Sequence, residues 1–447
     1  MNAQPKSSSR SSKTAALRLR LRNTVSKSSK DFNQHAVIAR ALTIQTQNEL
    51  HSSSPLDSSA YLSEAPYQVL DFFCGCGGMS SGFAALGNLF PSFEVIGGCD
   101  INPDAGASFE ANHKAPCLIR DITRLKTDPR SIASLLSEYP RYDSNRPLVL
   151  IGCAPCQGFT SHRKKNWAAE DNRNKLVGAF ANLATSLKPA CIVMENVPEF
   201  LSHKYWKFYE SFKKQLEDAG YVVKASIYNT AAFGVPQERF RALVLAMRKD
   251  FVLPHDLLER ENFVTVRQAI GELPAVSPGK AHPGDVLHRC ARHLESTLST
   301  IKAVPKNGGS RPAGVGPKCL DKVKGYYDVY GRLFWDRPAI TITQYARNPA
   351  SGRYTHPEQN RGLTIREAAL LQSFPPEYSF LGGFDAIFKQ VGEAVPPKFS
   401  CAIAAHVLTE LSLGETGVKR DFQYRTVTKP VNNSYSSVIA GIKTKKK

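Results

Sequence analysis

The sequence predicts an α/β protein built on a doubly wound parallel sheet, with a small loop-rich domain inserted into it. From Tyr67 onward, short apolar segments alternate with amphipathic ones, which is the pattern of strands followed by crossover helices. The alternation stops around Pro274, where glycine- and proline-rich sequence without a clear period begins. Ordered patterns return at Arg337 and continue into a last helical pattern after Pro397. The insert therefore interrupts a single sheet domain.

Each predicted element rests on a local signal. The expected strands are short apolar segments bounded by turn residues, at residues 68–73, 93–99, 147–151, 190–194, 221–227 and 241–247. Asn102 and Pro103 suit the N-cap and the first residue of a helix, and Gly220 ends an amphipathic segment that begins at Tyr205. Further helices are expected from Met79, near residues 364–372, and from Pro397 to about residue 413.

The charge of the chain is unevenly distributed. Of 447 residues, 42% are hydrophobic and 22% charged, as in globular proteins, and the net charge is +19. Residues 1–30 hold eight Lys and Arg without an acid, residues 418–447 hold eight against one Asp, and residues 275–335 hold ten against four acids. A basic insert in a nearly neutral body favours a polyanionic partner, whereas the basic ends alone could be solubilising tags.

The first 65 residues are rich in Ser, Lys and Arg and poor in aromatic residues, so we expect a disordered arm; an organelle transit peptide is the second interpretation. No apolar run approaches the length of a membrane span and no secretory signal is present. We therefore expect a soluble intracellular protein with ten reduced cysteines. We expect no metal site, because Cys153 and Cys156 form a C-x-x-C without the second pair that a four-ligand zinc site needs.

Cys156 follows the predicted strand at residues 147–151, in the sequence Pro155-Cys156-Gln157. The carboxyl ends of parallel strands form the edge where open α/β sheets bind ligands, and a cysteine thiolate is a strong nucleophile at neutral pH. The position therefore suits covalent catalysis. Buried packing is the alternative, because cysteine is among the most buried residue types.

A glycine-rich turn ends the first strand, where residues 71–78 read Asp-Phe-Phe-Cys-Gly-Cys-Gly-Gly. Glycines let the backbone approach a ligand, and the helix that follows offers N–H groups to an anion. The second strand ends in Asp100, a position where an acid commonly holds the hydroxyls of a ribose. Asp121 follows the next apolar segment and could accept from an adenine amino group. Each of these acids could equally be a helix cap.

Two more groups should lie at the same edge. Glu195 follows the strand at residues 190–194, which places it near Cys156. A thiol that adds to an electron-poor ring needs an acid on the ring nitrogen, so Glu195 would have to be protonated when it acts. Gln237, Arg239 and Arg241 alternate at a strand start, which puts both arginines on one face to orient a phosphate and a base carbonyl. The alternative is a surface strand of ion pairs.

Together these motifs resemble those of the DNA (cytosine-5) methyltransferases of the prokaryotic modification type, in order and spacing, over roughly residues 66–413. The motifs are residues 71–83, Pro155-Cys156-Gln157, Glu195-Asn196-Val197, Gln237-x-Arg239-x-Arg241 and residues 392–397. The resemblance implies a catalytic methyltransferase domain at 66–274, a target-recognition domain at 275–345, a hinge segment at 346–384, a helix returning to the catalytic domain at 385–413, and a basic tail at 414–447.

The resemblance also implies a mechanism. The target cytosine would be flipped out of the duplex, because C5 and C6 cannot be reached in a stacked base. Cys156 would add to C6, Glu195 would engage N3, and C5 would take the methyl group of S-adenosylmethionine, with Arg239 and Arg241 completing the catalytic set. The implied cofactor contacts are Phe73, Gly75, Gly77, Gly78, Asp100, Ile101, Asp121, Ile122, Pro155, Glu393 and Ala394. The implied substrate contacts are Gln157, Asn196 and Gln237.

Three positions carry separate expectations. Glu393 stands where the family usually has Asn; its carboxylate could still meet the ammonium group of the cofactor. Ile101 stands where an aromatic residue often stacks on the adenine, so that contact should be weaker. Arg311, on a glycine-rich loop of the basic insert, is the side chain that we expect to contact DNA.

The expected partner is double-stranded DNA, bound by a monomer in the cytoplasm or nucleoid of a prokaryote as part of a restriction-modification system. An RNA cytosine methyltransferase is the nearest alternative, but the Cys-Phe-Thr motif that marks the transfer-RNA branch is absent from the sequence. A cofactor-binding DNA regulator without activity has no need of Cys156, Glu195 and Arg241. A nicotinamide oxidoreductase fits the fold class but leaves those same residues unexplained.

Overall fold

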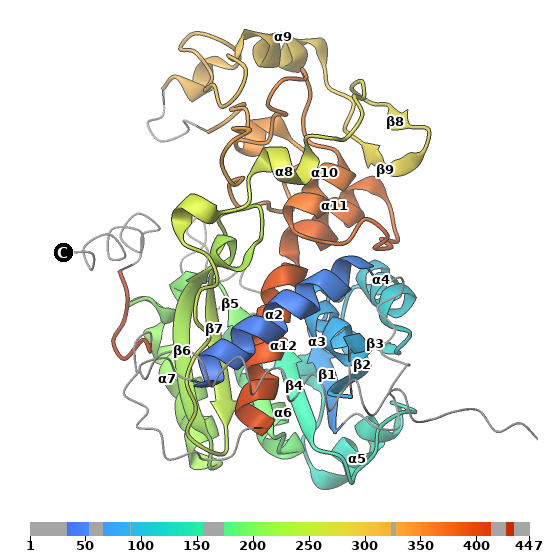
Figure 1. Cartoon of the computed structure of the whole chain (residues 1–447), viewed down its shortest axis with the longest axis vertical. Coiled ribbons are helices and arrows are strands. Elements are labelled where there is room, and N and C mark those ends of the chain that lie inside the picture. Colours follow the sequence, from blue (N-terminus) through green and yellow to red (C-terminus); the bar gives the residue numbers. More distant parts are fainter. Residues whose placement is uncertain are drawn as a thin grey trace, which may run out of the picture.

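The computed structural model describes residues 34–52, 66–89, 91–154, 174–322, 328–412 and 426–432. These residues form two lobes, which lie one above the other in Figure 1. The lower one, here called the sheet lobe, contains the central sheet and its covering helices, from the described residues up to 262 and from residue 394 onward. The upper one, here called the insert lobe, comprises the described residues from 263 to 393.

The sheet has seven strands in the order β3-β2-β1-β4-β5-β7-β6. They are β1 (Tyr67–Phe72), β2 (Phe93–Asp100), β3 (Cys117–Ile119), β4 (Leu148–Gly152), β5 (Cys191–Asn196), β6 (Val222–Asn229) and β7 (Phe240–Met247). Six of these are the predicted strands, shifted by no more than two residues at either end, while the short β3 was not predicted. The doubly wound α/β class is therefore confirmed.

One strand departs from the predicted parallel order. β7 runs antiparallel to both β5 and β6, whereas the other neighbouring pairs are parallel. Residues 230–239, which join β6 to β7, include only the short 3₁₀ helix η4 (Thr230–Phe233), and a parallel pair would need a longer crossover. As a consequence the start of β7 lies beside the end of β5, with Asn196 opposite Ala242.

Helices cover both faces of the sheet. On one face lie α2 (Gln34–Ser52), α3 (Gly78–Leu89), α4 (Pro103–His113) and α12 (Pro397–Ser412), and on the other lie α5 (Pro129–Ser137), α6 (Asn174–Leu187) and α7 (Trp206–Asp218). Successive strand residues point to opposite faces, so Val149 and Ile151 join the first core while Leu148 and Leu150 join the second. Strands buried on both faces explain the continuous apolar runs of the sequence.

Predicted helix ends are confirmed where a cap was visible in the sequence. The side chain of Asn102 accepts from the backbone N–H groups of Asp104 and Ala105, and Pro103 is the first residue of α4. α7 ends two residues before Gly220, whose φ of +86° suits glycine. In the insert lobe, α10 (Ile365–Leu371) begins with Thr364 and Glu367 in a capping box.

The predicted disordered arm at residues 1–65 is wrong for residues 34–52. These residues form α2, which packs against α12 and α3. Ala39, Leu42 and Leu50 are buried on its inner side, together with Thr43 and Thr46, whose hydroxyls bond to carbonyls one turn back. A helix with so few large apolar residues has a weak periodic signal, which explains why it was missed.

The predicted tail at residues 414–447 also contains a segment that packs on the sheet lobe. Residues 426–432 lie along the edge strand β6 and the 3₁₀ helix η3 (Pro198–Leu201). Val427 N donates to Ala225 O at 2.8 Å, and Val431 N donates to Leu201 O at 2.9 Å. The segment thus pairs with backbone groups that an edge strand would otherwise expose.

The insert lobe has little regular structure. Its elements are α8 (Val266–Ile270), the hairpin of β8 (Ala281–His282) and β9 (Asp285–Arg289), α9 (Glu295–Ala303), α10 and α11 (Phe384–Glu393). The remaining 3₁₀ helices of the described chain are η2 (Ile122–Arg124), η5 (Arg260–Asn262), η6 (Lys318–Leu320) and η7 (Pro349–Ser351). Three buried arginines, Arg332, Arg353 and Arg361, hold its loops together.

The lobe is larger than the predicted recognition domain at residues 275–345. It begins before α8, and α11 packs on α10 within it, so residues 385–413 do not form one returning helix. Only α12 returns to the sheet, after the break at Pro396 and Pro397. Among the residues placed here, no helix combines the length and the apolar character needed to cross a membrane.

Candidate active site

The carboxyl end of β5 brings together two of the predicted catalytic residues. Nε of Arg241 lies 2.8 Å from Oε1 of Glu195, and the side chains are 14% and 9% exposed. The contact is an ion pair without the alignment of a hydrogen bond, so this buried Oε1 has no hydrogen-bond partner within the described chain. The pair exists because β7 is antiparallel, which puts the start of β7 beside Glu195. A buried, positioned carboxyl oxygen is thus available at the sheet edge.

Asn196 is a buried residue at the end of β5 that contacts the chain just after β4. It is 1% exposed, its Nδ2 donates to the carbonyl of Ala154 at 3.3 Å, and its Oδ1 accepts from Val197 N at 2.9 Å. The amide is buried and engaged in the free protein, so its contact with a substrate stays a prediction. Ala154 is the last described residue before Pro155, Cys156 and Gln157, which lie outside the described residues.

Gln237 and Arg239 are also internal. Gln237 is fully buried, and its amide bonds to Leu371 O, Gln372 Oε1 and Ile342 N. Arg239 is 2% exposed and donates to the carbonyls of Ile342, Gly392 and Ala394. Both side chains are engaged inside the free protein, so the substrate contact of Gln237 and the catalytic role of Arg239 stay predictions. Both side chains tie the two lobes together beside Arg241.

The glycine-rich turn after β1 is held in an unusual backbone conformation. Phe73 and Gly75 have φ of +60° and +53°, and Gly77 has φ of +93°. A non-glycine residue at positive φ is uncommon and clusters at functional sites. A Cβ on Gly75 would meet nothing within 4 Å, so this side of the turn is open. Phe73 is half-buried, with its ring 6.3 Å from that of Phe180.

Asp100 lies next to this open side. Its Oδ2 accepts from Gly75 N and its Oδ1 accepts from Asn102 N, both at 2.8 Å. Each carboxylate oxygen can accept a second hydrogen bond, so two positions remain for a pair of hydroxyls. The neighbouring Ile101 is 67% exposed, a large apolar side chain without cover from the described residues. This arrangement fits the nucleoside part of a ligand.

Asp121 occupies the predicted place but serves as a cap. Its Oδ1 accepts from both the backbone N–H and the hydroxyl of Thr123, at 2.9 and 2.7 Å. These hydrogen bonds lower the pKa of Asp121 below its ordinary value. Ile122 is 5% exposed and belongs to the core on the α6 face, so it can support the Asp121 turn from inside.

Two side chains that the sequence analysis missed hold the glycine turn from behind. Nε2 of His113, at the end of α4, lies 3.1 Å from Gly77 O, and the hydroxyl of Tyr378 donates to Cys76 O. Burial lowers the pKa of His113 to about 4, so the neutral imidazole can donate to Gly77 O. A Cβ on Gly77 would lie 2.3 Å from His113 Nε2, which requires glycine there. The glycine at position 77 is the one feature of the sequence that pointed to this support.

A buried acid lies beneath the same turn. Asp71 is fully buried, and its Oδ2 accepts from the hydroxyl of Ser80 at 2.7 Å. Burial raises the pKa of Asp71 to about 8, so the side chain is mostly protonated at neutral pH. The turn therefore rests on polar groups that carry little charge.

The loop after α11 closes the predicted cofactor site from the other end of the chain. Glu393 is exposed in the last turn of α11, with Lys389 Nζ 3.9 Å from its Oε2. The carbonyl of Ala394 accepts from Arg239 at 3.0 Å. A Cβ on Gly78 would lie 2.3 Å from Val395 O and 3.2 Å from Ala394 Cβ, so the loop packs directly on the start of α3. Predicted cofactor residues from both ends of the chain thus meet.

The insert lobe does not present Arg311 to solvent. Its side chain is 9% exposed, with Nη1 donating to Val315 O at 2.6 Å and Nη2 donating to Asp321 Oδ1 at 2.9 Å. In the free chain its donors therefore hold the loop that carries it, and a contact of Arg311 with DNA stays a prediction.

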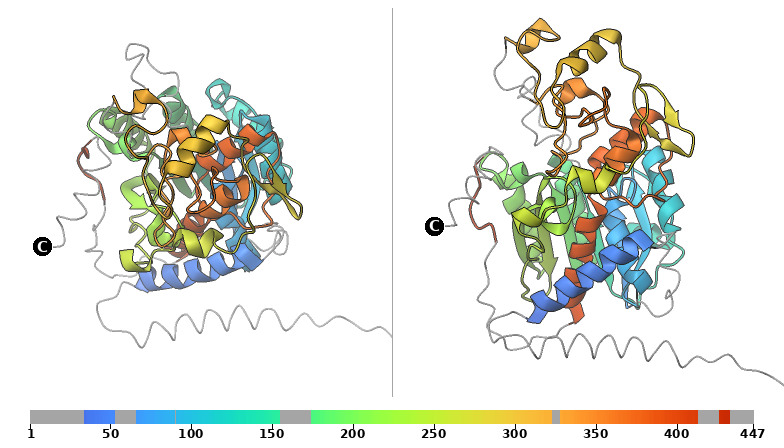
Figure 2. Two further views of the ribbon diagram at one scale, coloured as in Figure 1. Left: turned by 90° about the horizontal axis from the view of Figure 1, so that it is seen from above. Right: turned by 45° about the horizontal axis from the view of Figure 1, so that its top comes forward.

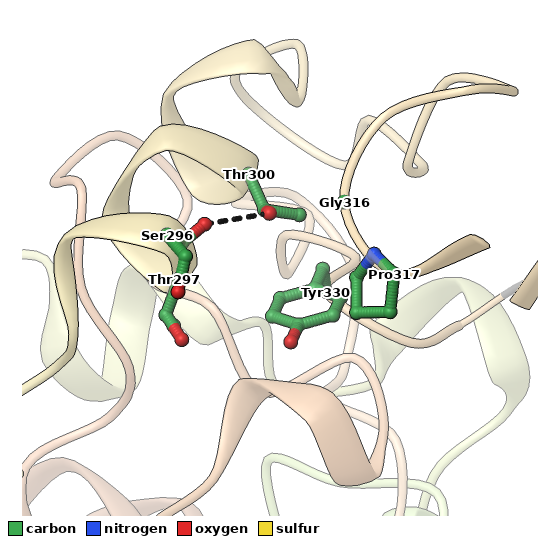
Figure 3. A pocket seen from close by; sticks show the side chains of 6 residues that line it. All are labelled: Ser296, Thr297, Thr300, Gly316, Pro317 and Tyr330. Atoms are coloured by element: carbon green, nitrogen blue, oxygen red, sulfur yellow. Dashed lines mark hydrogen bonds between the residues drawn. The ribbon is translucent and has the colours of Figure 1, made fainter. Parts of the chain in front are cut away.

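A separate hollow of ≈ 330 Å³ opens in the insert lobe between α9 and Pro317 (Figure 3). Hydroxyl-bearing residues of α9 line it, and Thr300 Oγ1 donates to Ser296 O at 2.8 Å. Tyr330 lines the hollow from the opposite side. None of the predicted catalytic or cofactor residues contributes to it. We assign it no part in the chemistry at the sheet edge.

Known proteins resemble this chain in sequence and in fold. The model of the C-5 cytosine-specific DNA methylase family matches residues 67–409. The chain is 33% identical over 350 residues to the Type II methylase M.HgiDII of Herpetosiphon aurantiacus, covering 76% of this chain and 94% of the relative. It is 34% identical over 344 residues to the Type II methyltransferase M1.HphI of Haemophilus parahaemolyticus, covering 76% of this chain and 86% of the relative.

A solved structure from E. coli, described as a DNA modification methyltransferase encoded within a prophage, has the same fold. Its TM-score is 0.60 at 20% sequence identity, and the superposition covers 78% of this chain and 100% of that one. The family match spans the seven-stranded sheet, the insert lobe and most of α12, and it includes Glu195 and Arg241 at the sheet edge. The chain belongs to the C-5 cytosine-specific DNA methylase family.

Proposed function

We propose that this DNA (cytosine-5) methyltransferase uses Cys156 as its nucleophile and Glu195 as the acid beside it, on a cytosine flipped out of duplex DNA. Family membership supports the reaction class. The observation that carries the assignment of roles is the buried Oε1 of Glu195, which is paired with Arg241 yet has no hydrogen-bond partner in the described chain. A carboxyl oxygen in that state is ready for a ring nitrogen of a substrate.

The residues act in a defined order. The Cys156 thiolate forms a bond to C6, and N3 takes a proton through Glu195 as the ring takes up electrons. Bound S-adenosylmethionine supplies the methyl group that C5 takes. A base then removes the C5 proton, the C5–C6 double bond re-forms as the thiolate leaves C6, and N3 returns its proton to Glu195. Arg241 positions the Glu195 carboxyl throughout, at 2.8 Å from its Oε1.

The residues around the glycine turn fit S-adenosylmethionine. Asp100 has two acceptor positions left for ribose hydroxyls, and exposed Ile101 can cover one face of an adenine ring. The open side of Gly75 gives room for the ligand backbone. Glu393, exposed beside the start of α3, can pair with the ammonium group of the methionine part.

We place duplex DNA against the sheet edge and the insert lobe. Flipping brings the target base to Glu195, and cations exposed on the insert lobe, such as Arg292, Lys306 and Arg337, supply charge for the phosphates. Since the relatives are named as Type II methylases of bacteria, we propose a monomer that modifies a short duplex sequence in the cytoplasm.

Bisulfite sequencing of plasmid DNA tests the proposal. The plasmid is taken from a host without cytosine methylation that expresses the wild type, Cys156→Ser, Glu195→Gln, or the control Cys319→Ser at an exposed cysteine. We expect one short motif to be protected by the wild type and the control. Cys156→Ser should leave it unprotected, and Glu195→Gln should lower the rate by about 10²- to 10⁴-fold.

Two outcomes would overturn it. Protection by Cys156→Ser at the wild-type level would exclude Cys156 as the nucleophile. Full conversion of DNA from cells with folded wild type that binds S-adenosylmethionine would exclude the DNA substrate, and methylation of bulk RNA by the same protein would then be measured.

A further inference from the structure

The helix α2 lies outside the part of the chain that the family model matches, which begins at residue 67. It crosses in front of α3 and α12 in Figure 1 and runs along the rim of the molecule in the left view of Figure 2. Leu50 is fully buried and Leu42 is 5% exposed in this contact. The helix thus precedes the part of the chain that the family model matches, and it docks on the two helices that flank the predicted cofactor site.

One side chain of α2 joins two separate loops. Nε2 of Gln47 donates to Phe233 O at 2.7 Å and to Lys398 O at 3.0 Å. The same side chain packs over Gly234, where a Cβ would lie 3.6 Å from Gln47 Oε1. Both acceptors are main-chain carbonyls, so the contact fixes backbone positions rather than side chains.

Each of these carbonyls lies a few residues from a motif. Phe233 ends η4, just before the run of Gln237, Arg239 and Arg241. Lys398 is in the first turn of α12, directly after the loop at residues 393–397 that carries Glu393 and Ala394. Gln47 therefore links the segment that ends at the catalytic pair to the segment that closes the predicted cofactor site.

The same two segments are linked a second time from inside. Arg239 donates to the carbonyls of Gly392 and Ala394, on the side of the loop that faces the sheet. The start of α12 is also fixed to α3, because the hydroxyl of Ser400 donates to Met79 O. A Cβ on Gly82 would lie 2.2 Å from the backbone of Ser400, so the two helices touch closely there. Arg239 and Gln47 thus hold the cofactor loop between them.

We propose that α2 is a clasp for the cofactor loop, and that Gln47 is a positioning residue that sets the affinity for S-adenosylmethionine. The inference rests on the proposed function, which places the cofactor against Glu393, Ala394 and the glycine turn. Gln47 touches neither cofactor nor substrate; it acts through the backbone of Phe233 and Lys398. Loss of its two hydrogen bonds lets the loop at residues 393–397 move and weakens cofactor binding.

The test compares Gln47→Glu with Asn48→Asp in the full-length protein. Both exchange an amide for a carboxylate on the same helix, but Asn48 is exposed and makes none of these bonds. Glutamate at position 47 keeps the shape and removes both donors. The Kd for S-adenosylmethionine is measured by titration calorimetry and kcat with saturating DNA and cofactor, at a temperature well below the melting temperature of each protein.

We expect Gln47→Glu to raise the Kd by about tenfold while kcat falls less than twofold, and Asn48→Asp to change neither. A merely structural role predicts a lower melting temperature and a smaller active fraction with the same Kd, which would overturn the proposal. Should Gln47→Glu fail to fold, Gln47→Met keeps the side-chain length without the donors and takes its place. If the wild type itself does not bind the cofactor, the proposed function fails before this inference is reached.

Discussion

The two lobes satisfy their backbone polar groups in different ways. In the sheet lobe, strands such as β4 are buried along their whole length and bond to neighbours on both sides. In the insert lobe, the strands within its described residues are β8 and β9, which form a separate two-stranded sheet. Its loop carbonyls must therefore find donors elsewhere, since buried backbone groups are rarely left unpaired.

Arginine side chains supply those donors. Arg332, 1% exposed, donates to the carbonyls of Ile301, Val304, His356 and Gln359. Arg353 donates to those of Gly308, Gly309 and Arg332. With five N–H groups in a planar fork, one guanidinium can replace several rungs of a strand ladder. Part of the basic composition of the insert thus serves folding, and only its exposed cations are left for the proposed contact with DNA.

The largest expected effect comes from breaking the buried ion pair of the insert lobe. Arg361 and Glu367 are 0% and 1% exposed, with both guanidinium nitrogens 2.7 to 2.8 Å from the carboxylate oxygens. Arg361→Met leaves the carboxylate buried without its ion-pair partner, while Thr364 N still donates to it. We expect the free energy of unfolding to fall by about 3–5 kcal/mol. Urea unfolding followed by hydrogen exchange should locate the loss in the insert lobe while the sheet lobe stays protected.

The double variant Arg361→Met/Glu367→Gln is the matched control. Glutamine can still take part in the capping box with Thr364 but carries no charge. We expect it to recover part of the lost stability. Equal destabilisation of the single and double variants would mean that packing around Arg361, and not the unpaired charge, dominates. Loss of protection in both lobes at once would mean that they fold as one unit.

Lowering the pH should compare the stability of the two lobes, because each lobe contains one buried histidine. Burial lowers the pKa of His113 and of His356 to about 4. The native protein keeps both rings neutral, whereas the unfolded chain takes up a proton near the ordinary pKa of 6.5. Their contribution is therefore fully present above about pH 6.5 and is lost as the pH falls toward 4. Each histidine should lower the free energy of unfolding by about 2 kcal/mol at pH 5.

His113→Gln and His356→Asn remove one titration each while keeping one polar contact. The glutamine amide can reach Gly77 O, and the asparagine oxygen can replace the Nδ1 that accepts from Glu358 N and Gln359 N. The measurement is urea unfolding at pH 7.5 and pH 5, compared with the wild type. The difference between the two pH values should shrink by about 2 kcal/mol in each variant. An unchanged difference would show that the ring is protonated in the native state.

Prediction from the sequence succeeded where a local pattern has one structural outcome. Apolar runs bounded by turn residues gave six strands, and polar residues placed at their ends, such as Asp100 and Glu195, do lie at the carboxyl edge of the sheet. Asn102 and Pro103 capped α4 as expected. These signals are local, because the residues that create the structure are neighbours in the chain.

It failed where the partner of a side chain is distant in the sequence. Gln237 and Arg239 carry donors suited to a substrate, but in the free protein their acceptors are carbonyls more than a hundred residues away. The support of the glycine turn by His113 and Tyr378 is equally long-range. The direction of β7 depends on the length of the connection from β6, not on the composition of the strand. The helix α2 has too few large apolar residues to be recognised from its own sequence. The type of a residue shows which hydrogen bonds its side chain can make, but not which residues are its partners.

The smallest effect, on DNA affinity, is expected from a change at Arg311. It tests whether the basic residues of the insert lobe divide into those that fold the lobe and those that contact DNA. The guanidinium of Arg311 donates to Val315 O and to Asp321, whereas Lys306, five residues earlier in the chain, is exposed. Arg311→Gln and Lys306→Gln remove the same charge. DNA affinity is measured by fluorescence anisotropy over a range of salt concentrations. We expect Lys306→Gln to reduce the salt slope by about one and Arg311→Gln to leave it unchanged.

The slope, rather than the affinity, decides this case. A phosphate contact releases counterions when it forms, so its loss changes the dependence on salt, while a loosened loop weakens binding about equally at every salt concentration. Arg311→Gln should therefore lower the affinity by less than about twofold without a change of slope. A slope reduced as much as in Lys306→Gln would mean that the Arg311 guanidinium leaves Asp321 for a phosphate when DNA binds. The hydrogen bonds within the insert lobe could then be exchanged for DNA contacts. The division between basic residues that fold the lobe and basic residues that face DNA would hold only for the free protein.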